Sequence, residues 1–267
     1  MSNELNGRHR VDDHPQAYLP GDRRRALASG ASMPDRVRGA ALFADVSGFT
    51  ALTEALATEL GAQRGAEELT ATLNTVFHAV IADVDRYGGQ VIYFSGDAIT
   101  CWFDGDDGMR GVATGLDIQR TMDTVGRVTT PAGTEVILAI KVAIAVGPAR
   151  RFVVGDPDIQ LIDVLAGSIV DELAEAEQLA EKGDVLLTDS VVASLGHRVT
   201  TSEELRKGHR IVRAESLTVA VAEIDAGPEP VLPEAEVRPW LLPVVYERLS
   251  TGRGEFLAEL QIGRAHV

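Results

Sequence analysis

The sequence predicts an α+β fold in which helices pack on an antiparallel sheet, and two features of its apolar pattern carry this prediction. Short apolar runs of strand length flank turn residues, as at 90–94 and 98–103 on either side of Ser95-Gly96-Asp97. Longer segments with apolar residues at helical spacing lie between such pairs. Helices that interrupt hairpins are typical of an antiparallel sheet covered by helices.

Each expected element follows from its own pattern. Residues 40–46 form a nearly continuous apolar run, which indicates a buried strand, and residues 49–60 repeat apolar side chains at helical spacing. The helix expected at 66–87 ends at Gly88-Gly89. Further helices are expected at 108–126, 166–182 and 190–195. Further strands are expected at 136–146, 151–154, 185–188, 199–201, 210–213 and 219–224, the second of them as partner of the first.

Composition and charge limit the classes of partner. The chain has 267 residues, of which 45% are hydrophobic and 24% charged, as in an ordinary globular protein with a sizeable core. It carries 40 acidic against 25 basic residues, a formal net charge of −15. This surplus argues against a nucleic-acid surface, which needs clustered Lys and Arg, and against docking on anionic lipid. We therefore expect neither nucleic acid nor a membrane among its partners.

Cysteine usage and the chain's start indicate a compartment. The single cysteine, Cys101, excludes an internal disulfide and a cysteine-based zinc site, and its apolar neighbours predict a small buried side chain. No apolar run approaches the roughly 20 residues of a membrane helix. The N-terminus is polar, unlike a signal peptide. We expect a cytoplasmic protein.

The most informative segment is Phe43-Ala44-Asp45-Val46-Ser47-Gly48-Phe49-Thr50. An aspartate lies near the end of a buried strand, and the chain then turns through Ser-Gly into a helix. The N–H groups of Ser47 to Thr50 would lie at the helix start, where the dipole favours an anion, and Gly48 would let a phosphate approach the backbone. A carboxylate about 4 Å from a phosphate costs about 4 kcal/mol at an effective dielectric of about 20. A divalent ion, in the first place Mg²⁺, would resolve this conflict because it binds carboxylates together with substrate phosphates.

A second carboxylate, Asp97, lies in the turn of the expected hairpin. Ser-Gly-Asp is good turn chemistry by itself, so a purely structural role is the simple interpretation. Because it follows the strand–Asp–turn–helix segment, Asp97 is also a candidate second metal ligand. Two carboxylates on neighbouring strand ends could hold two ions for an in-line displacement at phosphorus.

Together, residues 43–50 and the Gly96-Asp97 hairpin resemble the two metal-binding motifs of class III nucleotidyl cyclases, over about residues 38–195. The resemblance implies a ferredoxin-like antiparallel sheet and the formation of a cyclic nucleotide and pyrophosphate from ATP or GTP. It implies that Asp45 and Asp97 are the catalytic and metal-binding aspartates, with two Mg²⁺ or Mn²⁺ ions per site. The Val46 carbonyl would serve the metal, and the amides of Ser47, Gly48, Phe49 and Thr50 the phosphates.

Four positions depart from the family pattern. Symmetric homodimeric cyclases carry an Asn and, four residues on, an Arg on the helix after a Val-x-Gly segment. Asp171 and Glu175 stand at those two places here, so the transition-state cation is replaced by a carboxylate. The base-selecting Lys would fall at Tyr93, and its acidic partner at Val164.

Class III sites form where two domains meet, so the resemblance implies a missing half. The chain is similar to the first domain of soluble-adenylyl-cyclase-like two-domain proteins. We expect the metal-binding half of an adenylyl cyclase that converts ATP to cyclic AMP and pyrophosphate, inactive alone. A second cyclase domain, in cis or as a dimer partner, would complete it. The alternative is a catalytically inactive cyclase-homology domain that binds nucleotide or dimerises to regulate an attached ATPase-like region. ATP against GTP stays open because base recognition lies in the other half.

Composition changes divide the chain. Residues 1–37 are polar and expected to be a largely irregular extension, with one helical turn around 23–27. The resemblance implies that residues 38–226 form the cyclase domain. Residues 227–261 contain five prolines, all between positions 228 and 243, and are expected to be a linker and helix that lead to a missing second domain.

The last seven residues back-translate as CAG ATC GGA AGA GCA CAC GTC, which reproduces a common short-read sequencing adapter. We therefore interpret 262–267 as a sequencing artefact and the chain as C-terminally truncated. Resequencing that finds these codons in the intact gene would contradict this hypothesis.

Overall fold

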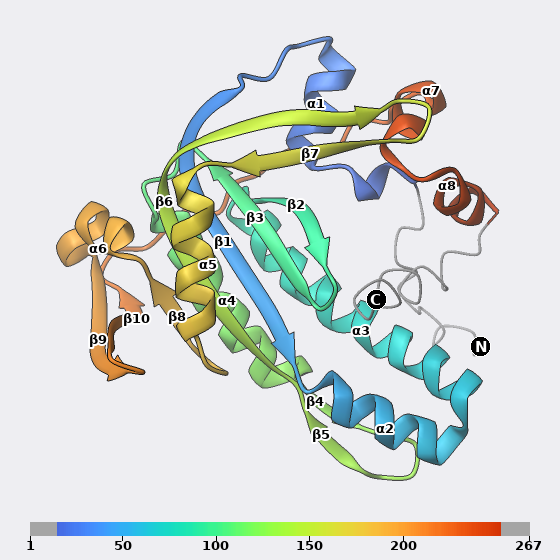
Figure 1. Cartoon of the computed structure of the whole chain (residues 1–267), viewed down its shortest axis with the longest axis horizontal. Helices are drawn as coiled ribbons and strands as arrows, with labels where there is room; N and C mark the ends of the chain where they lie inside the picture. Colours follow the sequence, from blue (N-terminus) through green and yellow to red (C-terminus); the bar gives the residue numbers. More distant parts are fainter. Residues whose placement is uncertain (1–14, 252–267) are drawn as a thin grey trace, which may run out of the picture.

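The computed structural model describes residues 15–251 (Figure 1). The strands are β1 (Arg36–Ser47), β2 (Gln90–Ser95), β3 (Ala98–Asp104), β4 (Arg127–Thr129), β5 (Glu135–Ile137), β6 (Ala139–Asp156), β7 (Gln160–Ala166), β8 (Val185–Leu187), β9 (Val199–Arg206) and β10 (His209–Leu217). The helices are α1 (Gly21–Ser29), α2 (Phe49–Leu60), α3 (Ala62–Arg86), α4 (Met109–Val125), α5 (Ser168–Leu179), α6 (Asp189–Leu195), α7 (Glu234–Val237) and α8 (Pro243–Ser250). Short 3₁₀ helices lie at η1 (Pro15–Tyr18), η2 (Gly196–Arg198) and η3 (Arg238–Trp240).

The main sheet has the strand order β2-β3-β1-β6-β8-β10-β9, and β7 pairs with the far part of β6. Within the described residues its neighbouring strands run antiparallel, except for β6 and β8, which are parallel. The small hairpin β4–β5 forms a separate two-stranded sheet. The prediction of an α+β fold with a mainly antiparallel sheet is therefore confirmed. No helix between residues 15 and 251 combines the length and apolarity needed to cross a membrane.

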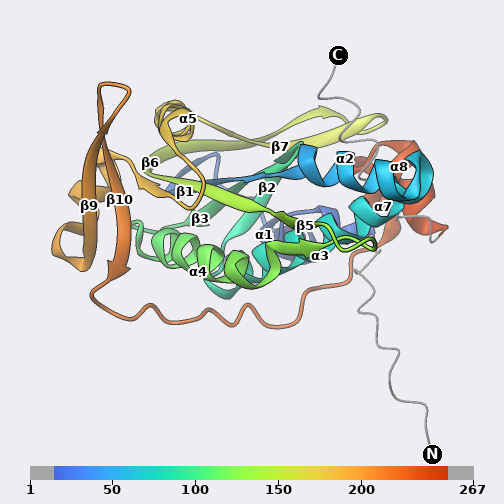
Figure 2. The ribbon, with the colours of Figure 1, turned by 90° about the horizontal axis from the view of Figure 1, so that it is seen from below.

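Alternation along β1 divides the interior into two cores. Ala40, Leu42 and Ala44 join a large core under α2, α3 and α4, whereas Ala41 belongs to a smaller one on the opposite face. Successive strand side chains point to opposite faces, which explains the division. Figure 2 shows α3 and α4 on one side of the sheet, and α5 with β7 on the other. The smaller core is packed chiefly from Ala143, Ala145, Leu165, Ile169, Leu173 and Trp102.

Most expected elements are found, and two expected strands are wrong. Residues 151–154 continue β6 instead of pairing back on it, because β1 runs beside this strand as far as the Arg36–Arg150 pair, past Gly147 and Pro148. Residues 219–224 form no strand. They cross beside α3 and α4 instead, where the N–H of Ile224 donates to the Arg86 carbonyl at 2.8 Å.

The segments before and after the sheet pack on one another. Helix α1 is longer than the single turn expected there, and the Pro-rich segment is docked rather than extended. Leu19 near α1 shares a third, small core with residues of the C-terminal segment: Leu232, Val237, Leu241 and Leu249. The side-chain oxygen of Gln16 accepts from the N–H of Leu232 at 3.0 Å. The interpretations of residues 252–261 and 262–267, and of residues 1–14, concern parts outside the described range.

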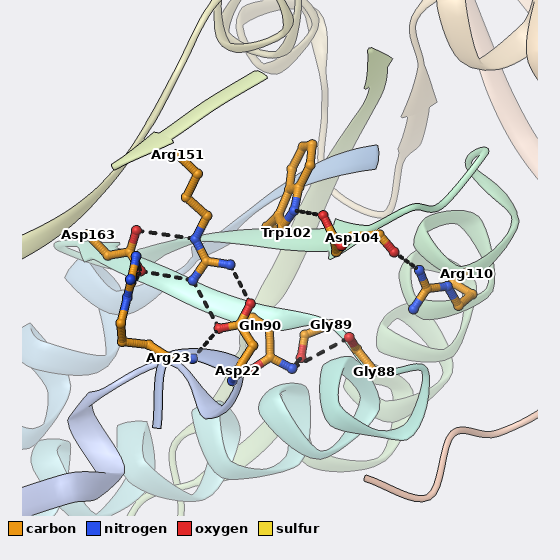
Figure 3. Close-up of polar contacts among 10 residues, drawn as sticks. All are labelled: Asp22, Arg23, Gly88, Gly89, Gln90, Trp102, Asp104, Arg110, Arg151 and Asp163. Carbon is orange, nitrogen blue, oxygen red and sulfur yellow. Dashed lines mark hydrogen bonds and ion pairs between the residues drawn. The ribbon is translucent and has the colours of Figure 1, made fainter. Parts of the chain in front are cut away.

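A buried ion network fastens α1 to the β6–β7 hairpin (Figure 3). Arg151, 3% exposed, lies between Asp22 and Asp163, with its Nη2 2.9 Å from Asp163 Oδ2. Arg23 binds the same Asp163 oxygen at 3.1 Å and stacks over the Trp240 ring at 5.5 Å. Each buried charge is thus paired, so the network ties α1, the hairpin and the C-terminal segment into one unit.

This network predicts a stability difference between two adjacent arginines. Arg151→Met should lower the free energy of unfolding by about 3 kcal/mol, because it leaves buried carboxylates without their shared cation. Arg150→Met is the matched control, since Arg150 is half-exposed and pairs with the equally exposed Asp35. It should cost less than about 1 kcal/mol. Urea denaturation of both variants measures this, and equal losses would contradict a structural role for the network.

Candidate active site

The pairing of β1 with β3 brings the two candidate aspartates together. Asp45 lies opposite Ala98, the residue that directly follows Asp97 in the β2–β3 turn. The N–H of Val46 donates to the carbonyl of Asp97 at 3.0 Å. The backbone of one aspartate is therefore anchored beside the other, at the end of the sheet where β1 gives way to α2.

On its other side, β1 places a lysine against Asp45. Asp45 and Lys141 are register partners on β1 and β6. Alternation puts both on the face that carries Ala41 and Ala143, the face covered by α5. Lys141 Nζ lies 3.2 Å from Asp45 Oδ2 and 2.6 Å from Glu177 Oε1 on α5. One ammonium therefore bridges the strand aspartate and the helix glutamate.

Burial and neighbouring charges shift the pKa values of Asp45 and Lys141. Burial raises the pKa of Asp45 above its ordinary value; the Lys141 hydrogen bond opposes the shift, and the neighbouring Asp97 charge adds to it. Burial lowers the pKa of Lys141, but its hydrogen bonds with Glu177 and Asp45 prevail and raise it. The site thus holds a half-buried carboxylate that is costly to ionise and an ammonium that stays charged. A divalent cation beside Asp45 and Asp97 would lower that cost.

Gly48 shapes the start of α2. Its φ is +105°, and a Cβ there would lie 2.8 Å from the carbonyl oxygen of Ile137. The glycine is thus required by the turn and by its contact with the last residue of β5. Leu52 N–H bonds to the Gly48 carbonyl as the first helical hydrogen bond. The earlier N–H groups, among them those of Phe49 and Thr50, have no partner within the helix and lack a side-chain cap.

Glu59 holds the other end of α2 on the β4–β5 hairpin. Its carboxylate accepts from the hydroxyls of Thr130 and Thr134, each at 2.7 Å, and from the N–H of Ala132 at 3.1 Å. The Thr130 and Thr134 hydrogen bonds hold the pKa of Glu59 below its ordinary value. Helix α2 is therefore anchored at both ends, so its N-terminal N–H groups are fixed relative to Asp45.

The structure separates the predicted residues into two groups. Asp45, Val46, Ser47, Gly48, Phe49, Thr50 and Asp97 lie together around the end of β1. Ser47 is the last residue of that strand, and its hydroxyl donates to the Ala139 carbonyl at 3.2 Å. The four altered positions lie on other elements: Tyr93 on β2, Val164 on β7, and Asp171 and Glu175 on α5. Within residues 15–251, none of these four shares a hydrogen bond or ion pair with Asp45 or Asp97.

Lys141 and Glu177 are the site residues that sequence reasoning missed. One signal existed for Lys141, because it is the single charge in the apolar run from Val136 to Val146. Its position opposite Asp45 depends on strand register, which the run does not reveal. Glu177 gave no signal, being one of four acidic residues on α5.

The oxygen ligands around Asp45 and Asp97 fit a hard divalent cation whose remaining ligands are water and substrate phosphates. Within the described residues, no three His, Cys, Asp or Glu side chains gather closely enough to hold a metal alone. Mg²⁺ typically takes one or two carboxylates and completes its shell with water and substrate phosphates. Asp45 and Asp97, with the Val46 carbonyl, could hold such an ion. The arrangement can therefore bind a metal–polyphosphate rather than a metal alone in a closed protein cage.

Comparisons with known proteins agree on one fold. Adenylate cyclase type 10 from Oryctolagus cuniculus is 31% identical over 156 residues, and that from Homo sapiens 30% over 156. Each match covers 58% of this chain and 10% of the relative, so the chain corresponds to about a tenth of these proteins. No protein-family model matches.

Solved structures extend the comparison. The adenylyl cyclase CyaB from P. aeruginosa superposes with a TM-score of 0.56 at 20% identity, over 73% of this chain and 98% of that one. The guanylate cyclase domain of RhGC from Catenaria anguillulae, solved with GTP, gives 0.54 at 20% identity, over 69% of this chain and all of that one. At such identities the likeness concerns the fold.

The raised pKa of Asp45 predicts how its removal affects stability. Asp45→Asn should stabilise the fold at neutral pH, because the ionised carboxylate is penalised by burial in the native state but not in the unfolded chain. The gain should shrink as pH falls through the native pKa of Asp45 toward the ordinary value of 3.8, since the native state then takes up the proton first. Urea denaturation across this range measures both. A variant that is less stable at neutral pH would contradict the assignment.

Proposed function

Because this chain carries a class III nucleotidyl cyclase domain, we propose that it is the metal- and phosphate-binding half of an adenylyl cyclase. ATP would be converted to cyclic AMP and pyrophosphate where this half meets a second cyclase domain. The observation that carries the proposal is the placement of Asp45 and Asp97 side by side, with Lys141 3.2 Å from Asp45. The similarity to adenylate cyclase type 10 supports ATP as the substrate.

The residues of this chain would bind and orient the triphosphate. Asp45, Asp97 and the Val46 carbonyl would hold Mg²⁺ or Mn²⁺, and bound ions of this kind activate a hydroxyl nucleophile and neutralise phosphate charge. The ribose 3′-oxygen bonds to the α-phosphorus while the bond to pyrophosphate breaks, so negative charge grows on the leaving group. Lys141 and the free N–H groups at the start of α2 would stabilise that charge.

The sheet face beside the site supports a partner domain. The exposed apolar side chains Tyr93 and Phe94 lie on β2, and Val154 pairs with Ile162 across the β6–β7 hairpin, with exposures of 37–46%. Elements β2 and β7 contact one another, which brings Tyr93 near the β6–β7 hairpin, whereas Phe94 points to the other face of β2, where its ring contacts that of Phe77 on α3. Exposed apolar side chains at the edge of a sheet favour an interaction site. A second cyclase domain that covers it would supply the base-selecting and transition-state groups absent at Tyr93, Val164, Asp171 and Glu175.

A second candidate function is a regulatory domain without catalysis. Asp171 and Glu175, both exposed on α5, favour it because neither can act as a cation for a phosphate. In this case the intact protein would bind a metal–ATP complex through Asp45 and Asp97 without turning it over.

The test compares the loss of two different aspartates in the full-length protein. Asp97→Ala should lower cyclic AMP formation from ATP by at least about 100-fold, because a charge-stabilising ligand is lost. Asp123→Ala is the control, since Asp123 is exposed on α4. It should leave the rate unchanged, and parallel assays with GTP establish the preferred base.

The outcomes separate the two functions. Activity that depends on Asp97 supports the cyclase half. Metal-dependent binding of an ATP analogue without turnover supports the regulatory domain. Near wild-type activity of the Asp97 variant would contradict the role of the site.

A further inference from the structure

Lys141 is shared unequally between two carboxylates. Its Nζ lies 2.6 Å from Glu177 Oε1 and 3.2 Å from Asp45 Oδ2. All three side chains are about a quarter exposed, at 22–26%. Helix α5 packs closely on β6, so the shorter contact joins two rigid elements. The ammonium is therefore held chiefly by the helix and only secondarily by the strand aspartate.

Glu177 occupies a place that disfavours a carboxylate. It lies in the last turn of α5, where the carbonyls carry partial negative charge and, without a basic residue in that turn, accept from Arg206 and Lys207. The ion pair with Lys141 supplies a cation to the Glu177 carboxylate itself. The same pair withdraws the ammonium from the oxygens that a metal at Asp45 would use.

The Lys141 ammonium and a divalent cation would compete for the carboxylate oxygens of Asp45. An ammonium that rests fully on Asp45 would neutralise the carboxylate and engage oxygens that a divalent ion would otherwise bind. An ammonium held at Glu177 leaves Asp45 charged and remains within reach of a phosphate bound beside it.

We propose that Glu177 is a positioning residue that holds Lys141 away from Asp45 and so keeps the aspartate pair open to a divalent cation. This inference rests on the proposed metal site at Asp45 and Asp97. It adds a residue from α5 that touches neither metal nor nucleotide and acts through Lys141.

Direct binding of Mn²⁺ to this chain, without nucleotide, tests the proposal through the electron paramagnetic resonance signal of the free ion. Glu177→Gln keeps the shape of the side chain and removes its charge. It should weaken Mn²⁺ binding about five-fold, the effect of one partly exposed ion pair. Glu175→Gln removes the same charge two residues earlier on α5, from an exposed position, and should change binding less than two-fold, roughly the influence of a screened surface charge.

A double-mutant cycle separates positioning from simple charge. In a Lys141→Met background no ammonium can move onto Asp45, so Glu177→Gln should then have an effect as small as that of Glu175→Gln. An equal loss with and without Lys141, or equal losses for Glu175→Gln and Glu177→Gln, would overturn the proposal.

A third arm distinguishes this inference from the proposed function. Asp45→Asn should abolish the site-specific Mn²⁺ binding. If it does, while Glu177→Gln leaves binding unchanged, the metal site stands and the role of Glu177 is refuted. If Asp45→Asn leaves Mn²⁺ binding intact, the metal site itself is refuted.

Discussion

The pairing of β1 with a strand on each side is the constraint on which the site depends. One register sets Asp45 opposite Ala98 and thereby beside Asp97, and the other sets it opposite Lys141. A slip of one residue in either pairing would exchange the two faces of the strand and move Asp45 into the large apolar core. Because Ala40, Leu42 and Ala44 are buried in that core, their burial fixes the register and, with it, the placement of the charged groups.

The site is therefore a group of polar residues at the end of β1, on a sheet with an apolar core on each face. Asp45 is held where burial disfavours its charge, and an ammonium, a neighbouring carboxylate and a free helix start gather around it. A domain selected only for stability would gain by removing such a carboxylate, so its presence favours a binding role for the site. At the four positions that the resemblance assigns to the opposite half of a cyclase site, Asp171 and Glu175 are acidic and Tyr93 and Val164 carry no charge. This asymmetry supports the proposal that a partner domain completes the site.

The sequence predicted more of the fold than of the site's electrostatics. The helix at Phe49–Leu60 and the hairpin around Asp97 could be predicted because period and turn chemistry are local. The continuation of β6 past Pro148 could not, since it depends on β1 running alongside. The docked C-terminal segment depends on long-range contacts with Leu19, and prolines indicate only that regular structure ends. Among the site residues, the aspartates lie in a recognisable motif, whereas Lys141 and Glu177 become neighbours only through strand register and helix packing.

Crystallography with manganese would show directly whether Asp45 and Asp97 together hold a divalent cation. Crystals of this chain grown with Mn²⁺ and a non-reactive ATP analogue would be measured at a wavelength at which manganese scatters anomalously. We expect an anomalous peak in contact with carboxylate oxygens of both aspartates, with the triphosphate reaching toward Lys141 and the start of α2. Strong peaks at other carboxylates only, with Lys141 still on Asp45, would contradict it.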